Sequence, residues 1–329
     1  VDLMRYAALN QGMDQLASFN GFIPRGKDFK TLPDLSKQQR YSDEQLYALA
    51  LYLYSLKPPP NPNKFDALAK RGQQVFQSEG CASCHTAPDV PATAPVGERL
   101  VLAGGRRFAT PFGTFTAPNV SMHPGAGIGG WTREQFATAV LLGVSPGGTH
   151  YFPAFPYATY ARATPQDVAD LWAFWQTLPA AASPSQPHDL GFPFNQRRAV
   201  GFWKLLNLDT EFVTTAPADA QIAPGRYLVE ALGHCAECHT PRDGLGGLDR
   251  SQWLAGAPNP VGEGRIPSLP PQGWTAFDIA AYLETGFTPE FDTAGGEMAD
   301  VVANISRIAA PDRAAIAAYL VALRASPNP

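Results

Sequence analysis

Two copies of the pattern Cys-x-x-Cys-His constrain this sequence more than any other feature. They are Cys81-Ala-Ser-Cys84-His85 and Cys235-Ala-Glu-Cys238-His239. The two thiols of each copy lie one helical turn apart, so both can form thioethers with the vinyl groups of a haem while the adjacent histidine reaches the iron. All 4 cysteines of the chain belong to these motifs, which leaves none for a disulfide. The sequence therefore predicts two haem c groups, with His85 and His239 as iron ligands.

Cys-x-x-Cys pairs also occur in zinc sites and in thiol redox proteins. A zinc site gathers its ligands from neighbouring knuckles, whereas these two pairs lie far apart in the chain. A redox pair does not require a histidine directly after it. Haem attachment is the interpretation that accounts for every residue of both motifs.

The composition is that of a folded protein with many turns. The chain has 32 Pro and 30 Gly, yet 45% of its 329 residues are hydrophobic, which argues against disorder. Its formal net charge of -4 is spread without a strong block, so we expect protein partners and no nucleic acid. No apolar run approaches the roughly 20 residues of a membrane-spanning helix, and no membrane span is predicted.

Helix signals recur along the chain, and sustained strand alternation is absent. Helices are expected to begin at Ser42, Thr132 and Thr164, where capping residues or a proline at the first helical position occur. Two more are expected over 275–283 and 311–323. The predicted fold class is therefore all-α, with long Gly- and Pro-rich loops.

The chain also repeats itself. Gly130-Trp131-Thr132 precedes an apolar helix that ends at Gly143, and Gly273-Trp274-Thr275 precedes a similar helix that ends at Gly286, at the same separation. Each repeat follows its own Cys-x-x-Cys-His motif, so two copies of one haem-binding unit are predicted. The expected order is a helical N-terminal segment, a first haem domain, a Pro- and aromatic-rich connector and a second haem domain, over residues 1–62, 63–182, 183–215 and 216–329.

The repeat also indicates where the sixth ligand of each iron would lie. A methionine opposite the histidine raises the potential of a haem, and Met298 lies after the second motif and before the last helix. The same register places Phe155 at the matching position of the first unit, and phenylalanine cannot bind iron. We favour His150, which lies earlier in the same loop, as the ligand of the first haem.

Other sequence candidates for the first iron remain open. They are Met122 or His123, Met4 or Met13 from the N-terminal segment, and a vacant position. A vacant or weakly held position would suit a peroxidase-type enzyme or a small-ligand sensor. A peroxidase also needs a distal acid and base, and His150 is the group on offer.

Several segments resemble the cytochrome c subunits of membrane-associated alcohol, gluconate and fructose dehydrogenases. They are 110–119, 127–131 and 151–157 around the first motif, and 225–230, 235–242 and 295–298 around the second. The resemblance covers about residues 71–323 and implies two tandem class I cytochrome c-like domains. It implies electron transfer from a dehydrogenase to a downstream cytochrome or oxidase, by a carrier or a subunit of an oxidoreductase complex. It also implies a periplasmic protein, because haem attachment in such relatives follows export.

The resemblance extends to particular residues. Pro118-Asn119 resembles the loop whose carbonyl orients the proximal histidine in small cytochromes c. Those dehydrogenase subunits usually have Met where this chain has Phe155, and they tend to carry three haem motifs where this chain has two. Residues 41–56 resemble the back half of another cytochrome c domain, so we expect the sequence to belong to a longer protein.

Overall fold

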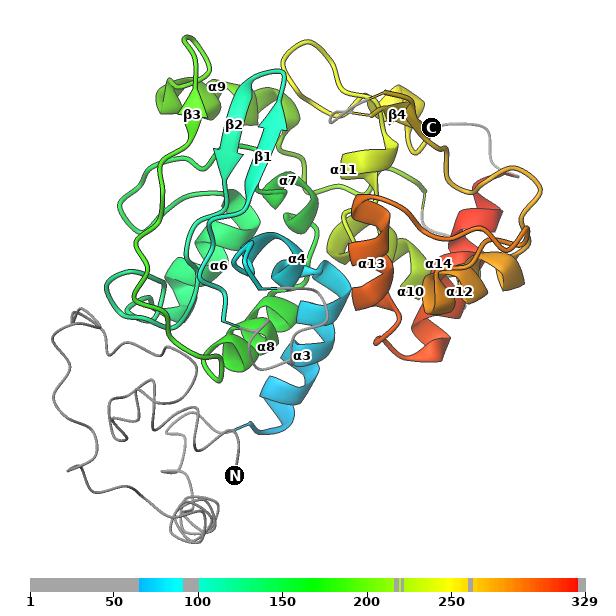
Figure 1. Cartoon of the computed structure of the whole chain (residues 1–329), viewed down its shortest axis with the longest axis horizontal. Helices are drawn as coiled ribbons and strands as arrows, with labels where there is room; N and C mark the ends of the chain where they lie inside the picture. The colour runs from blue at the N-terminus through cyan, green and yellow to red at the C-terminus, as the bar shows by residue number, and fades with distance from the viewer. Residues whose placement is uncertain (1–64, 91–100, 216–218, 220–221, 260–262, 325–329) are drawn as a thin grey trace, which may run out of the picture. The chain divides into compact units, whose positions relative to one another are not determined.

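The computed structural model describes residues 65–90, 101–215, 219, 222–259 and 263–324 (Figure 1). The chain divides into two compact units, Val1–Pro62 and Asn63–Pro329. The N-terminal segment over 1–62, with the helix expected from Ser42, lies outside the described residues.

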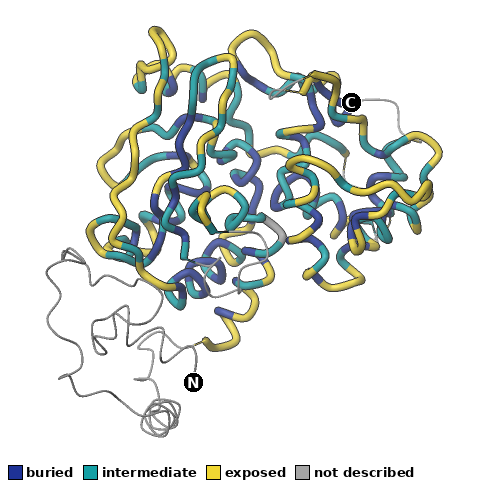
Figure 2. The backbone as a smooth tube through the Cα atoms, viewed as in Figure 1, coloured by how far each residue is buried: buried dark blue, intermediate teal, exposed yellow. Residues whose placement is uncertain are grey.

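The second unit contains two large hydrophobic cores. Figure 2 shows the buried residues along the backbone. The first core contains residues from Ala69 to Leu178 together with Leu232. The second contains residues from Val229 to Leu320. The burial of these apolar side chains is the main stabilising contribution to each half.

The first core is built on a close pair of helices, α3 (Ala67–Glu79) and α8 (Pro165–Trp175). A Cβ atom added to Gly72 would lie 1.8 Å from the backbone oxygen of Asp170, so only glycine permits this approach. Beside the crossing, the Nε of Arg71 donates to the Oδ2 of Asp170 at 2.6 Å. The remaining helices of this half are α4 (Cys81–His85), α6 (Arg133–Leu142) and α7 (Tyr157–Tyr160).

The second core repeats this close helix crossing with different elements (Figure 1). Helix α10 (Ala223–Tyr227) packs against α14 (Ala310–Ala322), and a Cβ atom on Gly225 would lie 1.9 Å from the backbone oxygen of Ala315. Helix α10 continues into a π-helical turn, η3 (Leu228–Leu232). The other helices are α11 (Ala236–His239), the 3₁₀ turn η4 (Arg250–Gln252), α12 (Ala276–Thr285) and α13 (Glu297–Ile305).

The two copies of the predicted repeat share their helix boundaries and caps. Helices α6 and α12 both begin with a capping box, at Thr132 and Thr275, and both end at a left-handed glycine, Gly143 and Gly286. An isolated antiparallel bridge follows each glycine, Val144 with His150 and Phe287 with Thr293. The helices expected over 132–142, 164–178, 275–283 and 311–323 are confirmed to within a few residues.

The structure is mainly helical, in agreement with the predicted class, and its described part also contains two small antiparallel sheets. Strands β1 (Arg107–Thr110) and β2 (Gly113–Thr116) form a hairpin, and β3 (Asp189–Leu190) pairs with β2. Strands β4 (Ala257–Pro258) and β5 (Arg265–Ile266) form the second sheet. Strands this short contain too few residues for an alternating pattern to show in the sequence.

The segment expected to be a simple connector contributes structure of its own. Besides β3 it forms helix α9 (Arg197–Asn207), which the sequence did not indicate. The Nζ of Lys204 in α9 donates to the carbonyl oxygens of Leu142 at 2.5 Å and Gly143 at 2.8 Å. These carbonyls belong to the end of α6, where a cation is favourable. Among the described residues, no helix is long and apolar enough to cross a bilayer.

Candidate haem sites

The first Cys-x-x-Cys-His motif forms the short helix α4. Gly80 adopts a left-handed conformation with φ of 63° and separates α3 from α4, so the chain turns sharply just before Cys81. The helical spacing brings Cys81 and Cys84 one turn apart and sets His85 at the end of the helix. Burial raises the pKa of the Cys84 thiol to about 11, which keeps it protonated before any thioether forms.

The imidazole of His85 is held in one orientation by a backbone carbonyl. Its Nδ1 lies 2.9 Å from the carbonyl oxygen of Pro118. A carbonyl can only accept, so Nδ1 carries the proton and Nε2 presents its lone pair. Burial also lowers the pKa of His85, which favours the neutral ring that an iron requires. The role expected for the Pro118 carbonyl is confirmed.

The second motif has the same chemistry on α11, which begins directly after Cys235. The Nδ1 of His239 lies 2.7 Å from the carbonyl oxygen of Pro267, and burial lowers the pKa of this histidine as well. Sequence reasoning missed Pro267. Its only signal was the repeat itself, and loops of unequal length between motif and repeat obscured the correspondence with Pro118.

The donor set fits haem better than a bare metal ion. Cys84, Cys235 and Cys238 are free thiols. Within the described ranges, no group of three or more His, Cys, Asp or Glu side chains is placed to hold a metal ion. The buried Nε1 of Trp253 in the second core has no hydrogen-bond partner in the described part of the chain. A buried indole N–H normally has an acceptor, and a haem propionate is a group that would provide one.

Met298 occupies the second position of α13 and is half-buried. It packs against the second core, as does Cys235 of the attachment motif. The methionine and the motif therefore border the same apolar interior. Ligation of the second iron by Met298 stays a prediction. At the matching position of the first half, Phe155 packs against the first core and meets the rings of Tyr151 and Tyr160 edge to face.

His150 contacts the connector helix. Its Nδ1 lies 3.1 Å from the Nζ of Lys204, and a Cβ atom on Gly201 would lie 3.0 Å from its Nε2. Both ring nitrogens therefore face α9, and binding of the first iron would require the imidazole to leave this helix. Ligation of the first iron by His150 stays a prediction, and it requires that the imidazole move away from α9.

The other candidate ligands of the first iron that lie among the described residues also make contacts within the protein. Met122 packs against the first core. The Nδ1 of His123 accepts hydrogen bonds from the backbone N–H groups of Gly125 at 3.2 Å and Ala126 at 2.9 Å. His123 thus fixes its own loop. Met4 and Met13 lie outside the described residues.

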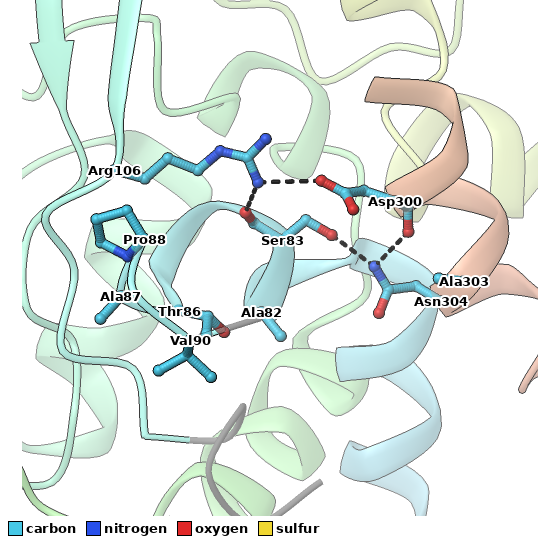
Figure 3. A pocket seen from close by; sticks show the side chains of 10 residues that line it. All are labelled: Ala82, Ser83, Thr86, Ala87, Pro88, Val90, Arg106, Asp300, Ala303 and Asn304. Atoms are coloured by element: carbon cyan, nitrogen blue, oxygen red, sulfur yellow. Dashed lines mark hydrogen bonds and ion pairs between the residues drawn. The ribbon is translucent and has the colours of Figure 1, made fainter. Parts of the chain in front are cut away.

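An arginine that the sequence did not single out links the two halves beside the first motif (Figure 3). The Nη1 of Arg106 donates to the carbonyl oxygen of Ser83 at 2.6 Å and to the Oδ2 of Asp300 at 3.0 Å. Its Nη2 donates to both carboxylate oxygens of Glu297, at 3.1 and 3.0 Å. Ser83 belongs to the first haem motif, whereas Glu297 and Asp300 flank Met298 on α13.

These two sites, each with its histidine held by a proline carbonyl beside paired thiols, define a c-type cytochrome. Comparison with known proteins agrees. Residues 69–179 match the family model described as cytochrome c. The chain is 52% identical over 281 residues to the diheme cytochrome c-type protein of Cereibacter sphaeroides, an alignment that covers 84% of this chain and 94% of that protein. The chain therefore belongs to the diheme c-type cytochromes.

Subunits of dehydrogenases are also similar to this chain. It is 33% identical over 259 residues to the fructose dehydrogenase cytochrome subunit of Gluconobacter japonicus, covering 76% of this chain and 51% of that subunit. It is 33% identical over 280 residues to the cytochrome c subunit of the quinone alcohol dehydrogenase of Gluconobacter oxydans, covering 80% and 56%. The chain thus spans about half the length of these dehydrogenase subunits. The resemblance expected from the sequence is confirmed.

Proposed function

We propose that this chain is a periplasmic electron carrier or electron-transfer subunit that receives electrons from a dehydrogenase and delivers them to a cytochrome or an oxidase. The observation that carries the proposal is the pair of Cys-x-x-Cys-His helices whose histidines present Nε2. Haem-based electron transfer is the activity that the family supports. The dehydrogenase donor is suggested by the names of the similar subunits.

We further propose that each core is one class I cytochrome c-like domain, over residues 63–182 and 216–329, joined by the connector over 183–215. Each half has a glycine at a close helix crossing, a haem motif, a proline carbonyl on the motif histidine and a capped helix after it. Two haem c groups would then be bound, one in each half.

The chain's own residues set the conditions for this activity. A bound haem supplies an iron that cycles between the ferrous and ferric states. The cysteines would hold it covalently, and the apolar cores would keep water from its buried side. The carbonyls of Pro118 and Pro267 fix the rings of His85 and His239.

The test is to produce the chain in a host that attaches haem c in the periplasm and to count covalent haems from the spectrum of the denatured protein. We expect two, with one lost when Cys81 and Cys84 are replaced by alanine and the other lost when Cys235 and Cys238 are replaced. Equal covalent loading in cells that keep the chain in the cytoplasm would contradict the periplasmic assignment. A wild-type chain without covalent haem would contradict the proposal as a whole.

A second candidate function follows from Phe155 at the register position of Met298, together with His150 on α9. The first iron would then be open to a small ligand, as a peroxidase-type enzyme or a sensor requires. Carbon monoxide binding to one reduced haem at neutral pH would favour this candidate. Two unreactive low-spin haems would exclude it, and a high-spin first haem in His150→Ala would assign His150 as the ligand.

A further inference from the structure

Hydrogen bonds link α4, the helix of the first haem motif, to α13, the helix that carries Met298. Arg106 contributes one attachment, since its guanidinium reaches Ser83 on α4 and both Glu297 and Asp300 on α13. Nη2 donates both bonds to Glu297, whereas Nη1 donates to Ser83 and Asp300. A lysine has one nitrogen and cannot serve both sets of acceptors. The Arg106 side chain is only 29% exposed, so solvent screens these charges less than on an open surface.

Asn304 provides a second, independent attachment between the same helices. Its Nδ2 donates to the Oγ of Ser83 at 2.6 Å and to the backbone oxygen of Asp300 at 2.9 Å. Figure 3 shows Arg106 and Asn304 reaching Ser83 from either side of a pocket whose lining includes Ala82, Thr86 and Ala303. The two residues between the motif cysteines, Ala82 and Ser83, therefore face α13.

Glu297 also acts electrostatically on the second cysteine of each motif. Burial raises the pKa of both Cys84 and Cys238, and the negative charge of Glu297 raises each of them further. Electrostatic effects of this kind act over short distances. The second cysteine of each motif therefore lies near the same carboxylate. These two sulfurs are points at which a haem would be attached in each half, so the charge of Glu297 would act near both attachment points.

We propose that Arg106 is a positioning residue for electron exchange between the two haems, because it holds the attachment helix of the first haem against the helix that carries Met298. This inference rests on the proposed function. One electron leaves a ferrous iron in one half and reduces a ferric iron in the other, and no bond forms and no proton moves. Arg106 keeps α4 and α13 in one arrangement relative to each other.

The charge of Arg106 gives the proposal a second consequence. Its guanidinium neutralises Glu297 and Asp300, which otherwise place two negative charges beside both attachment points. A negative potential disfavours the arrival of an electron. Loss of Arg106 should therefore lower the midpoint potentials of both haems and also slow the exchange between them.

The test uses the complete holoprotein with Arg106→Gln, Arg106→Lys and Arg107→Gln. Arg107 is the matched control, because it is the next residue in the chain but is exposed and lies 3.8 Å from Asp189. Both midpoint potentials are measured by spectroelectrochemical titration, and inter-haem exchange is measured after rapid photoreduction. We expect Arg106→Gln to lower both potentials and slow the exchange, Arg106→Lys to restore the potentials but not the rate, and Arg107→Gln to change neither.

The outcomes separate the inference from the proposed function. A wild-type chain with fewer than two covalent haems removes the proposed function, whatever Arg106 does. Two haems with unchanged potentials and an unchanged exchange rate in Arg106→Gln overturn the inference alone, as does an equal effect of Arg107→Gln. If Arg106→Gln does not accumulate as holoprotein, Asp300→Asn decides. That variant removes a negative charge and should raise both potentials while slowing the exchange, and unchanged values there also overturn the inference.

Discussion

Glu230 shows how a single buried charge is stabilised in this molecule. Its carboxylate is fully buried in η3 and accepts hydrogen bonds from the N–H of Val213 at 2.7 Å, the hydroxyl of Thr214 at 2.6 Å and the hydroxyl of Tyr319 at 2.5 Å. Burial raises the pKa of Tyr319, and the carboxylate raises it further, because an ionised phenol beside it would be repelled. One side chain thereby connects the end of the connector to α14.

Replacement of Glu230 by alanine should be strongly destabilising, because it removes the shared acceptor of Val213, Thr214 and the buried Tyr319. We expect the free energy of unfolding to fall by about 3 kcal/mol or more, measured by denaturant titration of the holoprotein. Glu211→Ala is the control, since that glutamate is exposed and should change stability by roughly 0.5 kcal/mol at most. Similar losses in the two variants would contradict this account of Glu230.

At the scale of the elements, each half contains one crossing at which two helices pack so closely that only glycine fits between them. Gly72 and Gly225 lie where α3 meets α8 and where α10 meets α14, and a methyl group at either position would overlap a backbone oxygen. Backbone atoms cannot move aside as the end of a side chain can. The helices must therefore separate if either glycine is replaced.

Gly72→Ala and Gly225→Ala should each lower the free energy of unfolding by about 1–3 kcal/mol through overpacking. Thermal unfolding of the holoprotein provides the measurement. Gly191→Ala is the matched control, because a Cβ atom at Gly191 meets nothing within 4 Å. Unchanged midpoints in both crossing variants would show that the helices are less closely packed than described.

The elements also show what the sequence can and cannot predict. Helices α6, α8 and α12 follow from local caps, and each haem motif with its histidine follows from spacing alone. Helix α9 and strand β3 depend on contacts with distant parts of the chain, and local patterns do not contain that information. Strands β1, β2, β4 and β5 pair locally but are too short for an alternating pattern to show. The same reason explains why Pro267 and Arg106 were missed. Arg106 acquires its role only when α13, far along the chain, lies beside it.

At the scale of the whole described unit, the two cores are not independent. Leu232 lies three residues before Cys235 of the second haem motif yet belongs to the first core. The hydroxyl of Tyr227 accepts from the N–H of Thr164 at 2.9 Å and donates to Asp167. The hydroxyl of Thr159 donates to Glu237, inside the second motif, at 2.7 Å. A disturbance at this boundary should therefore affect both halves.

Leu232→Ala tests whether the halves unfold together. Leu232 is 4% exposed, and its truncation should leave a cavity in the first core that costs about 2–4 kcal/mol. If the boundary couples the cores, calorimetry of the holoprotein will show one transition that moves to lower temperature as a whole. Leu206→Ala in α9 is the control, because that side chain is 61% exposed and its loss should leave the transition in place. If the variant shows two transitions and only one of them is shifted, the two halves unfold separately. The contacts of Tyr227, Thr159 and Arg106 would then join two domains that fold independently of each other.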